Sequence, residues 1–448
     1  MAKTKKAIII GGGISGKLAA RVLSDYFKEV IILERDSKPS GPHPRKGAPQ
    51  GEHLHALLHA GEYGLEKLFP GITNSFHSSG AIQINSTKDL SWYHHGVWKL
   101  QYDGGYSTTL QTRPHLEWHI EEYIKKIPNI EIYYNSAVQD YIYDSKNHQV
   151  TGVVVKANND CTQQAADIVI DASGATSLST NLLKRQGYVI PTHNVKIGLS
   201  YITKQFIIPD KKERNWQIKL VYPNPPKEKI GGTISRVEGN RYIVTLFGYE
   251  NVIDEKEVIK NNDHFINLTK KLSKLDIYHE LQEGTPITST AVYKIPQISW
   301  RRFDKVKELP KGLLLIGDTV CRVDPVFGQG MSIAVLESLA LRTLFERNSE
   351  NLERISRLFP KKVANIISPI WNMVISEDFR FSNIGGKRPF GLALQQWYSK
   401  KVFHLSSNDL FVYDTFIKVM NLVSPITILF HPRIVKSILK DTIIHRIK

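Results

Sequence analysis

The sequence predicts an α/β (α+β) fold: a Rossmann-like domain with an inserted β-rich domain, followed by a C-terminal helical region. Three stretches of the 448 residues predict it. Residues 5–36 have the pattern of strand, glycine turn, helix and second strand, and residues 195–249 have repeated strand patterns. Residues 312–339 have the pattern of another buried strand and helix. The strand-rich stretch is therefore predicted to interrupt one discontinuous domain.

The first stretch contains the pattern G-x-G-x-x-G at the start of a predicted helix. Gly11 permits a tight turn, Gly13 lets a pyrophosphate reach the backbone, and Gly16 lets the helix pack closely on the strand. Glu34 ends the second strand, where an acceptor for a ribose hydroxyl is expected. Leu18 stands where a P-loop needs Ser or Thr, so the pattern predicts a dinucleotide cradle and not a P-loop.

Length and composition limit the class of protein. A chain of this size with 41% hydrophobic residues can bury two or three cores. The apolar run at residues 7–10 is too short for a signal peptide, and Cys161 and Cys321 match neither a zinc spacing nor a disulfide framework. We therefore expect a cytoplasmic protein. The net charge of +16 is dispersed and no nucleic-acid-binding motif accompanies it, so an anionic cofactor or membrane surface fits better than nucleic acid.

Residues 37–59 lead from a loop rich in proline and glycine into an apolar stretch that is predicted to be helical. Arg45 is expected to reach a cofactor phosphate or the edge of a flavin, and Gln50 or His53 to line a pocket; a solvated loop is the alternative. His55 and His59 would share one helix face, as two metal ligands could. Because no third ligand accompanies them, no metal site is expected.

The stretch 80–110 contains many aromatic residues between short predicted strands, and these could wall an apolar pocket or simply pack in a core. They are Trp92, Tyr93, Trp98, Tyr102 and Tyr106. Further on, Arg113 stands at the N-terminal edge of a predicted helix over 112–126, where a phosphate could bind. A buried strand over 168–171 then leads into Ala172, Ser173 and Gly174, small residues that permit a close approach to the backbone.

The second buried strand, within 312–318, ends in Gly-Asp and is followed by a loop and a helix that is predicted to begin near Ser332. Asp318 can accept hydrogen bonds from a ribityl chain. The N–H groups of residues 325–331 would form a positive helix end that stabilises negative charge on a reduced flavin. An ordinary strand, turn and helix is the alternative.

The chain after Arg342 is predicted to be helical. Residues 416–430 are its most apolar run, but the run is interrupted and too short to cross a bilayer. Apolar residues recur at helical spacing between Lys and Arg over 433–448. This pattern predicts either a helix docked on its own protein or a basic amphipathic helix in peripheral contact with a membrane.

Five motifs together resemble the FAD-dependent monooxygenases of the para-hydroxybenzoate-hydroxylase-like fold. They are residues 11–16 with Glu34, RKGAPQGEHLH at 45–55, Arg113, DIVIDASG at 167–174, and GDTVCRVDPVFGQGMS at 317–332. The resemblance is closest to the squalene-epoxidase-like branch, which includes polyether epoxidases. SEDFRF at 376–381 and FHPRIVKSIL at 430–439 are also similar to that branch.

The resemblance implies a discontinuous FAD/NAD(P)-binding domain over 1–75, 110–182 and 290–345. A substrate domain would cover 76–109 and 183–289, and a helical region 346–448. The backbone of Gly328, Gly330 and Met331 is expected to provide catalytic electrostatics. With the motifs, the resemblance implies cofactor contacts from Gly11, Gly13, Ser15, Gly16, Glu34, Arg35, Arg45, Arg113, Val138, Ala172, Gly174, Asp318, Pro325, Gly328, Gly330 and Met331.

The implied reaction inserts one atom of O₂ into a polyene, terpenoid or aromatic natural product through a flavin C4a-hydroperoxide, with epoxidation of an alkene as the principal expectation. The electrons are expected from NAD(P)H, either directly or through a partner flavin reductase. The aromatic hydroxylases carry Asp-Gly where this chain has Asp171, Ala172, Ser173 and Gly174, which argues against direct use of NAD(P)H. The alternatives are an aromatic hydroxylase, a flavin-dependent reductase of isoprenoid double bonds and, among non-enzymes, a prenyl-protein escort.

Overall fold

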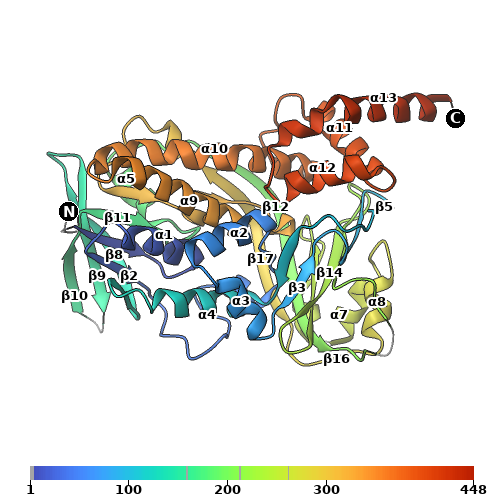
Figure 1. Cartoon of the computed structure of the whole chain (residues 1–448), viewed down its shortest axis with the longest axis horizontal. Helices are drawn as coiled ribbons and strands as arrows, with labels where there is room; N and C mark the ends of the chain where they lie inside the picture. The colour runs from blue at the N-terminus through green and yellow to red at the C-terminus, as the bar shows by residue number, and fades with distance from the viewer. Residues whose placement is uncertain (1–4, 158–159, 211–212, 261, 448) are drawn as a thin grey trace.

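The computed structural model describes residues 5–157, 160–210, 213–260 and 262–447. A five-stranded parallel sheet forms its first layer, in the order β18–β11–β1–β2–β7 (Figure 1). Each strand is a short apolar run because both faces of the sheet are covered. The strands are β1 (Lys6–Ile10), β2 (Glu29–Leu33), β7 (Ile130–Tyr133), β11 (Ile168–Asp171) and β18 (Leu313–Leu315).

Alternate residues of β1 pack into different cores, as the twofold period of a strand requires. Ala7 and Ile9 pack with the helices α1 (Ile14–Ser24), α9 (Gly330–Asn348) and α10 (Leu352–Asp378). Ile8 and Ile10 pack on the opposite side, with the antiparallel sheet β10–β9–β8. That sheet consists of β8 (Ser136–Asp144), β9 (Gln149–Ala157) and β10 (Asp160–Ala165). The expectation of an α/β fold with a Rossmann-like core is confirmed.

A large mixed sheet forms the second half of the molecule, in the order β19–β17–β12–β15–β14–β13–β4–β5. Two short strands, β16 (Thr285–Pro286) and β20 (Gly385–Gly386), also pair with β12, while β3 (Ile82–Asn85) and β6 (Ser107–Leu110) form a separate pair. The main strands are β4 (Leu90–His94), β5 (Val97–Trp98), β12 (Thr192–Ile207), β13 (Ile218–Val221), β14 (Ile230–Val237), β15 (Arg241–Gly248), β17 (Ala291–Arg301) and β19 (Cys321–Arg322).

The pairing of β12 with β17 places residues 291–301 in this large sheet. The predicted FAD-binding segment 290–345 therefore contributes β17 to the second sheet, returns to the first sheet in β18, and adds β19 to the second. Helices α6 (Glu255–Lys260), α7 (Asn262–Thr269) and α8 (Asp276–Leu281) cover one face of the large sheet. The connecting helices are α2 (His59–Leu68), α3 (Ile72–Ser78), α4 (Arg113–Ile124) and α5 (Leu178–Arg185).

The C-terminal region is helical and packs beside α10 and β5 (Figure 1). It contains α11 (Leu392–Leu405), α12 (Leu410–Met420) and α13 (Pro432–Ile447). Ile434 and Ile438 of α13 are buried, and Lys401 of α11 forms an ion pair of 2.7 Å with Asp441. The first half of α13 is thus docked on its own protein, whereas the structure does not describe the side chains of residues 443–448, on which part of the prediction rests. No helix in the described part of the chain is long and apolar enough to cross a membrane.

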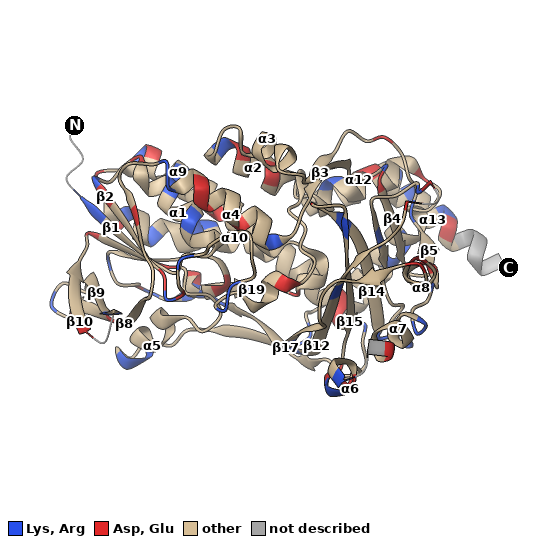
Figure 2. Ribbon diagram, turned by 90° about the horizontal axis from the view of Figure 1, so that it is seen from below, with Lys and Arg blue, Asp and Glu red and all other residues tan. Residues whose placement is uncertain are grey.

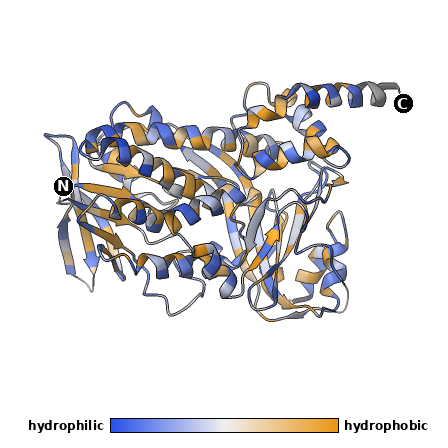
Figure 3. Ribbon diagram, viewed as in Figure 1, coloured by the Kyte–Doolittle hydropathy of each residue, from blue (hydrophilic) through white to orange (hydrophobic). Residues whose placement is uncertain are grey.

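The distribution of side chains agrees with this layering. Figure 3 shows hydrophobic residues along the strands of the parallel sheet and on the helices that cover it. Figure 2 shows Lys and Arg scattered among Asp and Glu over most elements, not gathered along one helix or strand. The excess positive charge is therefore spread over the molecule.

Candidate active site

A cavity of about 430 Å³ opens where the carboxyl ends of β1, β2 and β11 meet the N-terminal ends of α1 and α9. Ligands of open α/β sheets bind at this edge. Of the residues predicted to contact a cofactor, only Gly16 is absent from the cavity wall. Those that line it are Gly11, Gly13, Ser15, Glu34, Arg35, Arg45, Arg113, Val138, Ala172, Gly174, Asp318, Pro325, Gly328, Gly330 and Met331.

The three glycines of the G-x-G-x-x-G pattern after β1 have different surroundings. Gly11 has φ +99°, and a Cβ on it would lie 2.6 Å from the carbonyl oxygen of Ala172. A Cβ on Gly16 would collide with the carbonyl oxygen of Gly11, so this glycine lets α1 pack against the turn. Beside Gly13, apart from its two neighbours in the chain, no atom of the described residues lies within 4 Å of such a Cβ. Because α1 also lacks a capping side chain and an acid in its first turn, its N-terminal N–H groups are available to an anion.

Glu34 lies at the end of β2, as expected for a ribose acceptor. Its Oε2 accepts hydrogen bonds from the Gly12 N–H at 2.8 Å and from Arg45 at 3.3 Å, and its Oε1 accepts one from the Asp36 N–H. The carboxylate is therefore fixed beside the glycine turn. A ribose hydroxyl would have to share or replace the Arg45 contact.

A carboxylate that the sequence did not single out holds both predicted phosphate-binding arginines. Glu117 of α4 accepts hydrogen bonds from Arg45 at 2.8 Å and from Arg113 at 2.7 Å. Burial opposes ionisation of Glu117, but Arg113, Arg45 and Lys17 outweigh it and lower its pKa to about 2. The two guanidinium groups are thereby fixed at the cavity wall. In the sequence, Glu117 has the pattern of an ordinary helical surface residue.

The Gly-Asp turn after β18 contacts the start of α1. The Gly317 N–H donates to Glu337 of α9 at 2.8 Å, and a Cβ on Gly317 would meet Ser15 Oγ. Asp318 follows with its side chain exposed at the cavity wall. Glu337 is fully buried, its Oε1 has no hydrogen-bond partner among the described residues, and burial raises its pKa to about 8. The sequence does not indicate this buried acid either, because it lies within an apolar helix with no local motif.

The loop before α9 begins with the short turn η4 (Pro325–Phe327). Asp324 caps this turn by accepting a hydrogen bond from the Val326 N–H at 2.9 Å. Gly328 follows with φ +67°, and α9 begins at Gly330, slightly before the predicted Ser332. The first turn of α9 has neither a side-chain cap nor an acidic residue. Its positive end therefore faces the cavity, with Gly330 and Met331 in the wall.

A second, smaller cavity of about 150 Å³ adjoins the first. The two share Ala56, Tyr201, Pro325 and Gly328 as wall residues. The smaller cavity is walled mainly by apolar side chains, and no charged residue or histidine is among its described lining residues. Its wall includes Leu90, Trp92, Leu220, Tyr222, Phe247 and Ile417.

Of the aromatic residues predicted to wall a pocket, Trp92 lines the smaller cavity and the others pack elsewhere. Tyr93 packs on Trp98, with ring centroids 5.3 Å apart. The hydroxyls of Tyr102 and Tyr106 each donate to Asp414 at 2.9 Å. For these four residues the core-packing alternative describes the structure.

Comparison with known proteins identifies the family of the chain and its cofactor. A family model described as an FAD binding domain matches residues 4–346. The chain belongs to this family of FAD-dependent monooxygenases. FAD is therefore its cofactor. The glycine turn with open space at Gly13, the uncapped end of α1 and the paired arginines are the features that a dinucleotide needs.

Relatives and solved structures agree with this family. Protein Rv3254 of Mycobacterium tuberculosis is 30% identical over 84% of this chain and 80% of its own. The 6-hydroxy-3-succinoylpyridine 3-monooxygenase HspB of Pseudomonas putida is 22% identical over 82% of this chain and 88% of its own. The structure of pqsL, a probable FAD-dependent monooxygenase from Pseudomonas aeruginosa, has a TM-score of 0.65 at 16% identity, over 85% of this chain and 97% of its own. The flavin-dependent brominase Bmp2 shares the fold, with a TM-score of 0.67 at 13% identity over 93% of both chains.

The predicted helix containing His55 and His59 is not formed as expected, because α2 begins at His59. Residues 54–58 are instead tied to other elements: the Leu54 N–H donates to Thr245, and the Leu58 N–H donates to Ser332. His55 Nδ1 contacts the carbonyl oxygen of His53, and His59 Nδ1 contacts that of Ser107. The two imidazoles therefore do not share a helix face.

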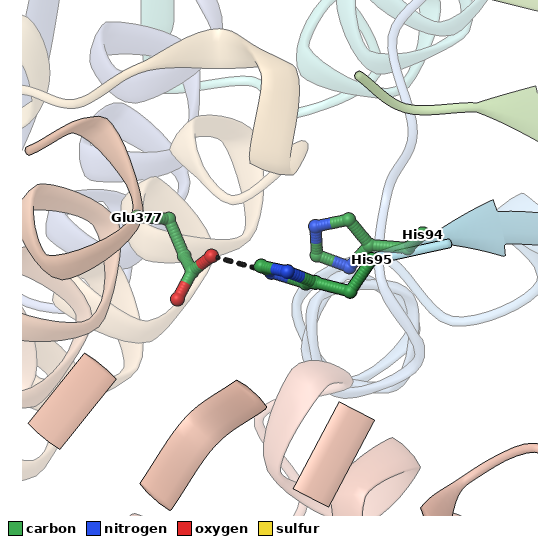
Figure 4. Close-up of side chains that lie close together, drawn as sticks. All are labelled: His94, His95 and Glu377. Carbon is green, nitrogen blue, oxygen red and sulfur yellow. Dashed lines mark hydrogen bonds and ion pairs between the residues drawn. The ribbon is translucent and has the colours of Figure 1, made fainter. Parts of the chain in front are cut away.

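A different cluster brings together His94, His95 and Glu377, whose ligand atoms lie within 4.8 Å of one another (Figure 4). Glu377 accepts hydrogen bonds from His95 at 2.9 Å and from Arg380 at 2.8 Å. Burial opposes its ionisation, but these partners lower its pKa to about 2. Buried Lys99 donates to the carbonyl oxygen of His94 at 3.4 Å, and Arg380 and His95 share the same oxygen, Oε2, of Glu377. The geometry is that of an ion-pair network between the end of β4 and the end of α10.

Proposed function

We propose that this FAD-dependent monooxygenase adds one oxygen atom from O₂ to an alkene in an apolar small molecule and releases an epoxide. The observation that carries the proposal is the apolar cavity that meets the cofactor cavity at Ala56, Tyr201, Pro325 and Gly328. A substrate held there by Trp92 and the surrounding aliphatic residues would lie next to the cofactor. The squalene-epoxidase-like resemblance of the sequence motifs supports the same reaction.

The chain's own groups would bind and orient FAD. The N–H groups beside Gly13 would bind the pyrophosphate, Glu34 a ribose hydroxyl and Asp318 the ribityl chain. Arg45 and Arg113 would add positive charge near the phosphates. Bound and reduced, FAD supplies the chemistry that activates O₂. The backbone amides from Gly328 to Met331 would stabilise negative charge on the flavin ring, and the apolar wall would exclude water.

The composition of the apolar cavity supports epoxidation over hydroxylation of a phenol. A phenol becomes a better nucleophile when a base removes its proton. The described wall of this cavity contains no carboxylate, lysine or histidine that could act as that base. Burial and the nearby Asp324 raise the pKa of Tyr201 and of Tyr222, so both hydroxyls are neutral at neutral pH. An alkene needs no such proton transfer in the oxygen-transfer step.

Hydroxylation of an aromatic ring is the second candidate. Trp92 and Phe247 in the cavity wall could stack on a ring, and HspB is named as a 3-monooxygenase of a substituted pyridine. The products distinguish the two reactions. A polyene or terpenoid epoxide supports the first candidate, and a ring alcohol supports the second.

The test is mass spectrometry of the products made under ¹⁸O₂ from reduced flavin equivalents and candidate polyenes, terpenoids and aromatics. A monooxygenase product gains one heavy oxygen.

Leu220→Trp, which fills the apolar cavity, should abolish turnover and retain FAD, whereas Leu394→Trp on the exposed face of α11 should be active. Product that forms without oxygen and carries no ¹⁸O would replace this proposal with a double-bond reductase. A colourless chain that binds prenylated peptides would replace it with an escort.

The electron source is a separate proposal. We infer that electrons come from NAD(P)H, either directly or through a partner flavin reductase. Ala172 and Ser173 follow Asp171 at the site where the aromatic hydroxylases carry Asp-Gly, which favours the partner reductase. Bleaching of the bound flavin by NADPH alone would contradict the need for a partner. Bleaching only after a flavin reductase is added would support it.

We also propose that the C-terminal helices make peripheral contact with an anionic membrane. Exposed Phe390, Leu394 and Trp397 lie in or just before α11, and Leu439 is exposed on α13. Exposed Arg388, Lys400, Lys436 and Lys440 accompany them. Apolar side chains with a basic surround are the composition of a membrane-surface helix.

A further inference from the structure

Two buried carboxyl groups meet behind the loop that leads into α9. Asp324 immediately precedes that loop, and Asp378 is the last residue of α10. Their side chains are almost completely buried, at 0% and 1% exposure. The proposed chemistry uses neither residue, and no sequence motif pairs them.

The hydrogen bonds of the pair are unequal. Asp324 accepts hydrogen bonds from the Val326 N–H at 2.9 Å and from the Tyr249 hydroxyl at 2.7 Å. No described N–H or O–H group donates to either oxygen of Asp378, and its side chain contacts that of Asp324. Two carboxylates cannot form a hydrogen bond to one another, because neither has a donor. The contact therefore requires a proton on one of the two groups.

The pair connects three parts of the molecule. Asp324 caps the turn whose Pro325 lines both cavities. Glu377, next to Asp378, binds His95 at the end of β4 (Figure 4). Phe381, just beyond α10, stacks on Tyr249 with ring centroids 4.2 Å apart. The end of α10 is thus in contact with the substrate-side sheet and with the cofactor loop.

We propose that Asp324 and Asp378 share one proton, and that this shared proton fixes the Pro325–Met331 loop beside the bound flavin. Asp378 is then a positioning residue that acts through Asp324. The proposal rests on the proposed placement of the loop beside the flavin ring. It does not depend on which substrate is oxidised.

Electrostatics favours the singly protonated pair over two ionised groups. Burial, followed by the charge of Asp324, raises the pKa of Asp378 well above its usual range, and burial also raises that of Asp324. The facing titratable groups are Tyr249, Tyr201 and Tyr222, which are neutral, and Glu377, which accepts a hydrogen bond from His95 and whose charge is opposed by Arg380.

The sign of the pH effect follows from these raised pKa values. The folded state binds the proton more tightly than the unfolded state, so the contribution to stability is fully present in acid. It is lost as the pH rises through the pKa of the folded pair. The loop is therefore expected to loosen on the alkaline side.

Two substitutions at Asp378 separate the proton from the contact. In Asp378→Asn the amide can donate to the Asp324 carboxylate at every pH, so the contact persists without a titrating proton. In Asp378→Ala the buried Asp324 loses its partner. The matched control is Asp254→Asn, an exposed helix-capping residue far from the loop in the sequence.

The measurements are the absorption spectrum of bound oxidised FAD from pH 6 to pH 10, the FAD release rate, and amide hydrogen exchange of a peptide covering residues 325–331. Asp378→Ala should release FAD about tenfold faster and exchange faster in this peptide at all pH values. The natural chain should show a change in the flavin spectrum as the pH rises. Asp378→Asn should match the natural chain at pH 6 and lack this alkaline change. The control should match the natural chain throughout.

Two results would overturn the shared proton: an Asp378→Ala protein that binds FAD and protects the loop like the natural chain, or an Asp378→Asn protein that behaves like Asp378→Ala. The readouts need oxidised FAD and no substrate. An inactive enzyme with these pH profiles would therefore contradict the proposed oxygenation alone. An enzyme that oxygenates its substrate but whose pH profiles differ from those expected here would contradict the shared proton alone.

Discussion

At the scale of single residues, some glycines of the turn after β1 are required by packing, and another leaves room for a ligand. Gly11 and Gly16 have protein atoms where a Cβ would stand, whereas the space beside Gly13 is empty. Substitutions at the first two positions disturb the turn itself. A substitution at Gly13 changes mainly what the turn can bind.

We therefore predict that Gly13→Glu yields folded, colourless protein, because its carboxylate would occupy and repel the pyrophosphate site. Gly13→Ala has room for its methyl group and should bind FAD with lower affinity. Flavin absorption of the purified proteins, together with circular dichroism, measures both. A yellow Gly13→Glu protein with full FAD occupancy would contradict the assignment of the cradle.

Glu337 gives a prediction about pH. Its pKa of about 8 in the folded chain lies above the value of an unfolded glutamate, so its contribution to stability is present in acid and declines as the pH rises towards 8. Between pH 6 and pH 9 the free energy of unfolding should fall by roughly 3 kcal/mol at most from this group.

Glu337→Gln tests that prediction, because a glutamine oxygen can still accept the Gly317 N–H and carries no charge. The difference in stability between pH 6 and pH 9, measured by denaturant unfolding, should shrink in this variant. Glu346→Gln, a substitution at the exposed end of α9, is the control. An unchanged difference would mean that Glu337 does not ionise in this range.

The candidate site was predictable where a residue follows a strand or turn with a local pattern. Glu34 at the end of β2 and Asp318 after β18 are of this kind. Glu117 and Asp378 were not predictable, because their roles depend on partners distant in the sequence. Asp378, for example, meets Asp324 only once α10 packs beside α9.

At the scale of elements, the segment before α2 shows how tertiary contacts override a local pattern. Its apolar residues have helical spacing, yet the N–H groups of Leu54 and Leu58 donate to Thr245 and Ser332. These partners come from β15 and α9. Because they occupy the backbone donors, the helix begins only at His59, and Ala56 is left in the wall between the two cavities.

Helix α13 is the element whose environment the sequence left open. Ile438 is buried, whereas the adjacent Leu439 is 55% exposed. We predict that Ile438→Ala lowers the free energy of unfolding by about 2–4 kcal/mol, because it leaves a cavity where α13 docks. Leu439→Ala should have an effect within about 0.5 kcal/mol. Equal effects of the two substitutions on chemical denaturation would contradict the docked arrangement.

At the scale of the whole molecule, the parallel sheet was predictable because each strand is an apolar run next to a turn pattern. The pairing of the large sheet was not. Strand β17 follows β12 after many intervening residues but pairs with it directly, and the hydrophobic pattern of neither strand specifies that partner. The apolar cavity could not be predicted from the sequence for the same reason, since its wall comes from five or more separate segments of the chain.

The surface of the whole molecule gives the last prediction. Exposed apolar residues occur in several places, but those from Phe390 to Leu439 lie among exposed lysines and arginines of the C-terminal helices. Each basic residue near an anionic bilayer contributes about 1 kcal/mol, and salt screens this attraction. The chain should therefore bind vesicles containing phosphatidylserine at low salt and dissociate as salt rises.

Two sets of substitutions locate that contact. Lys436→Glu with Lys440→Glu should abolish binding in a vesicle sedimentation assay, because it removes the electrostatic attraction. Phe390→Ser with Leu394→Ser should weaken binding, because it removes the apolar side chains that enter the interface. Val189→Ser is the matched control, since Val189 is exposed outside the C-terminal helices. These side chains are exposed, so the folded protein should tolerate every change. Binding that survives both double substitutions would show that the basic, apolar face of the C-terminal helices is not a membrane contact.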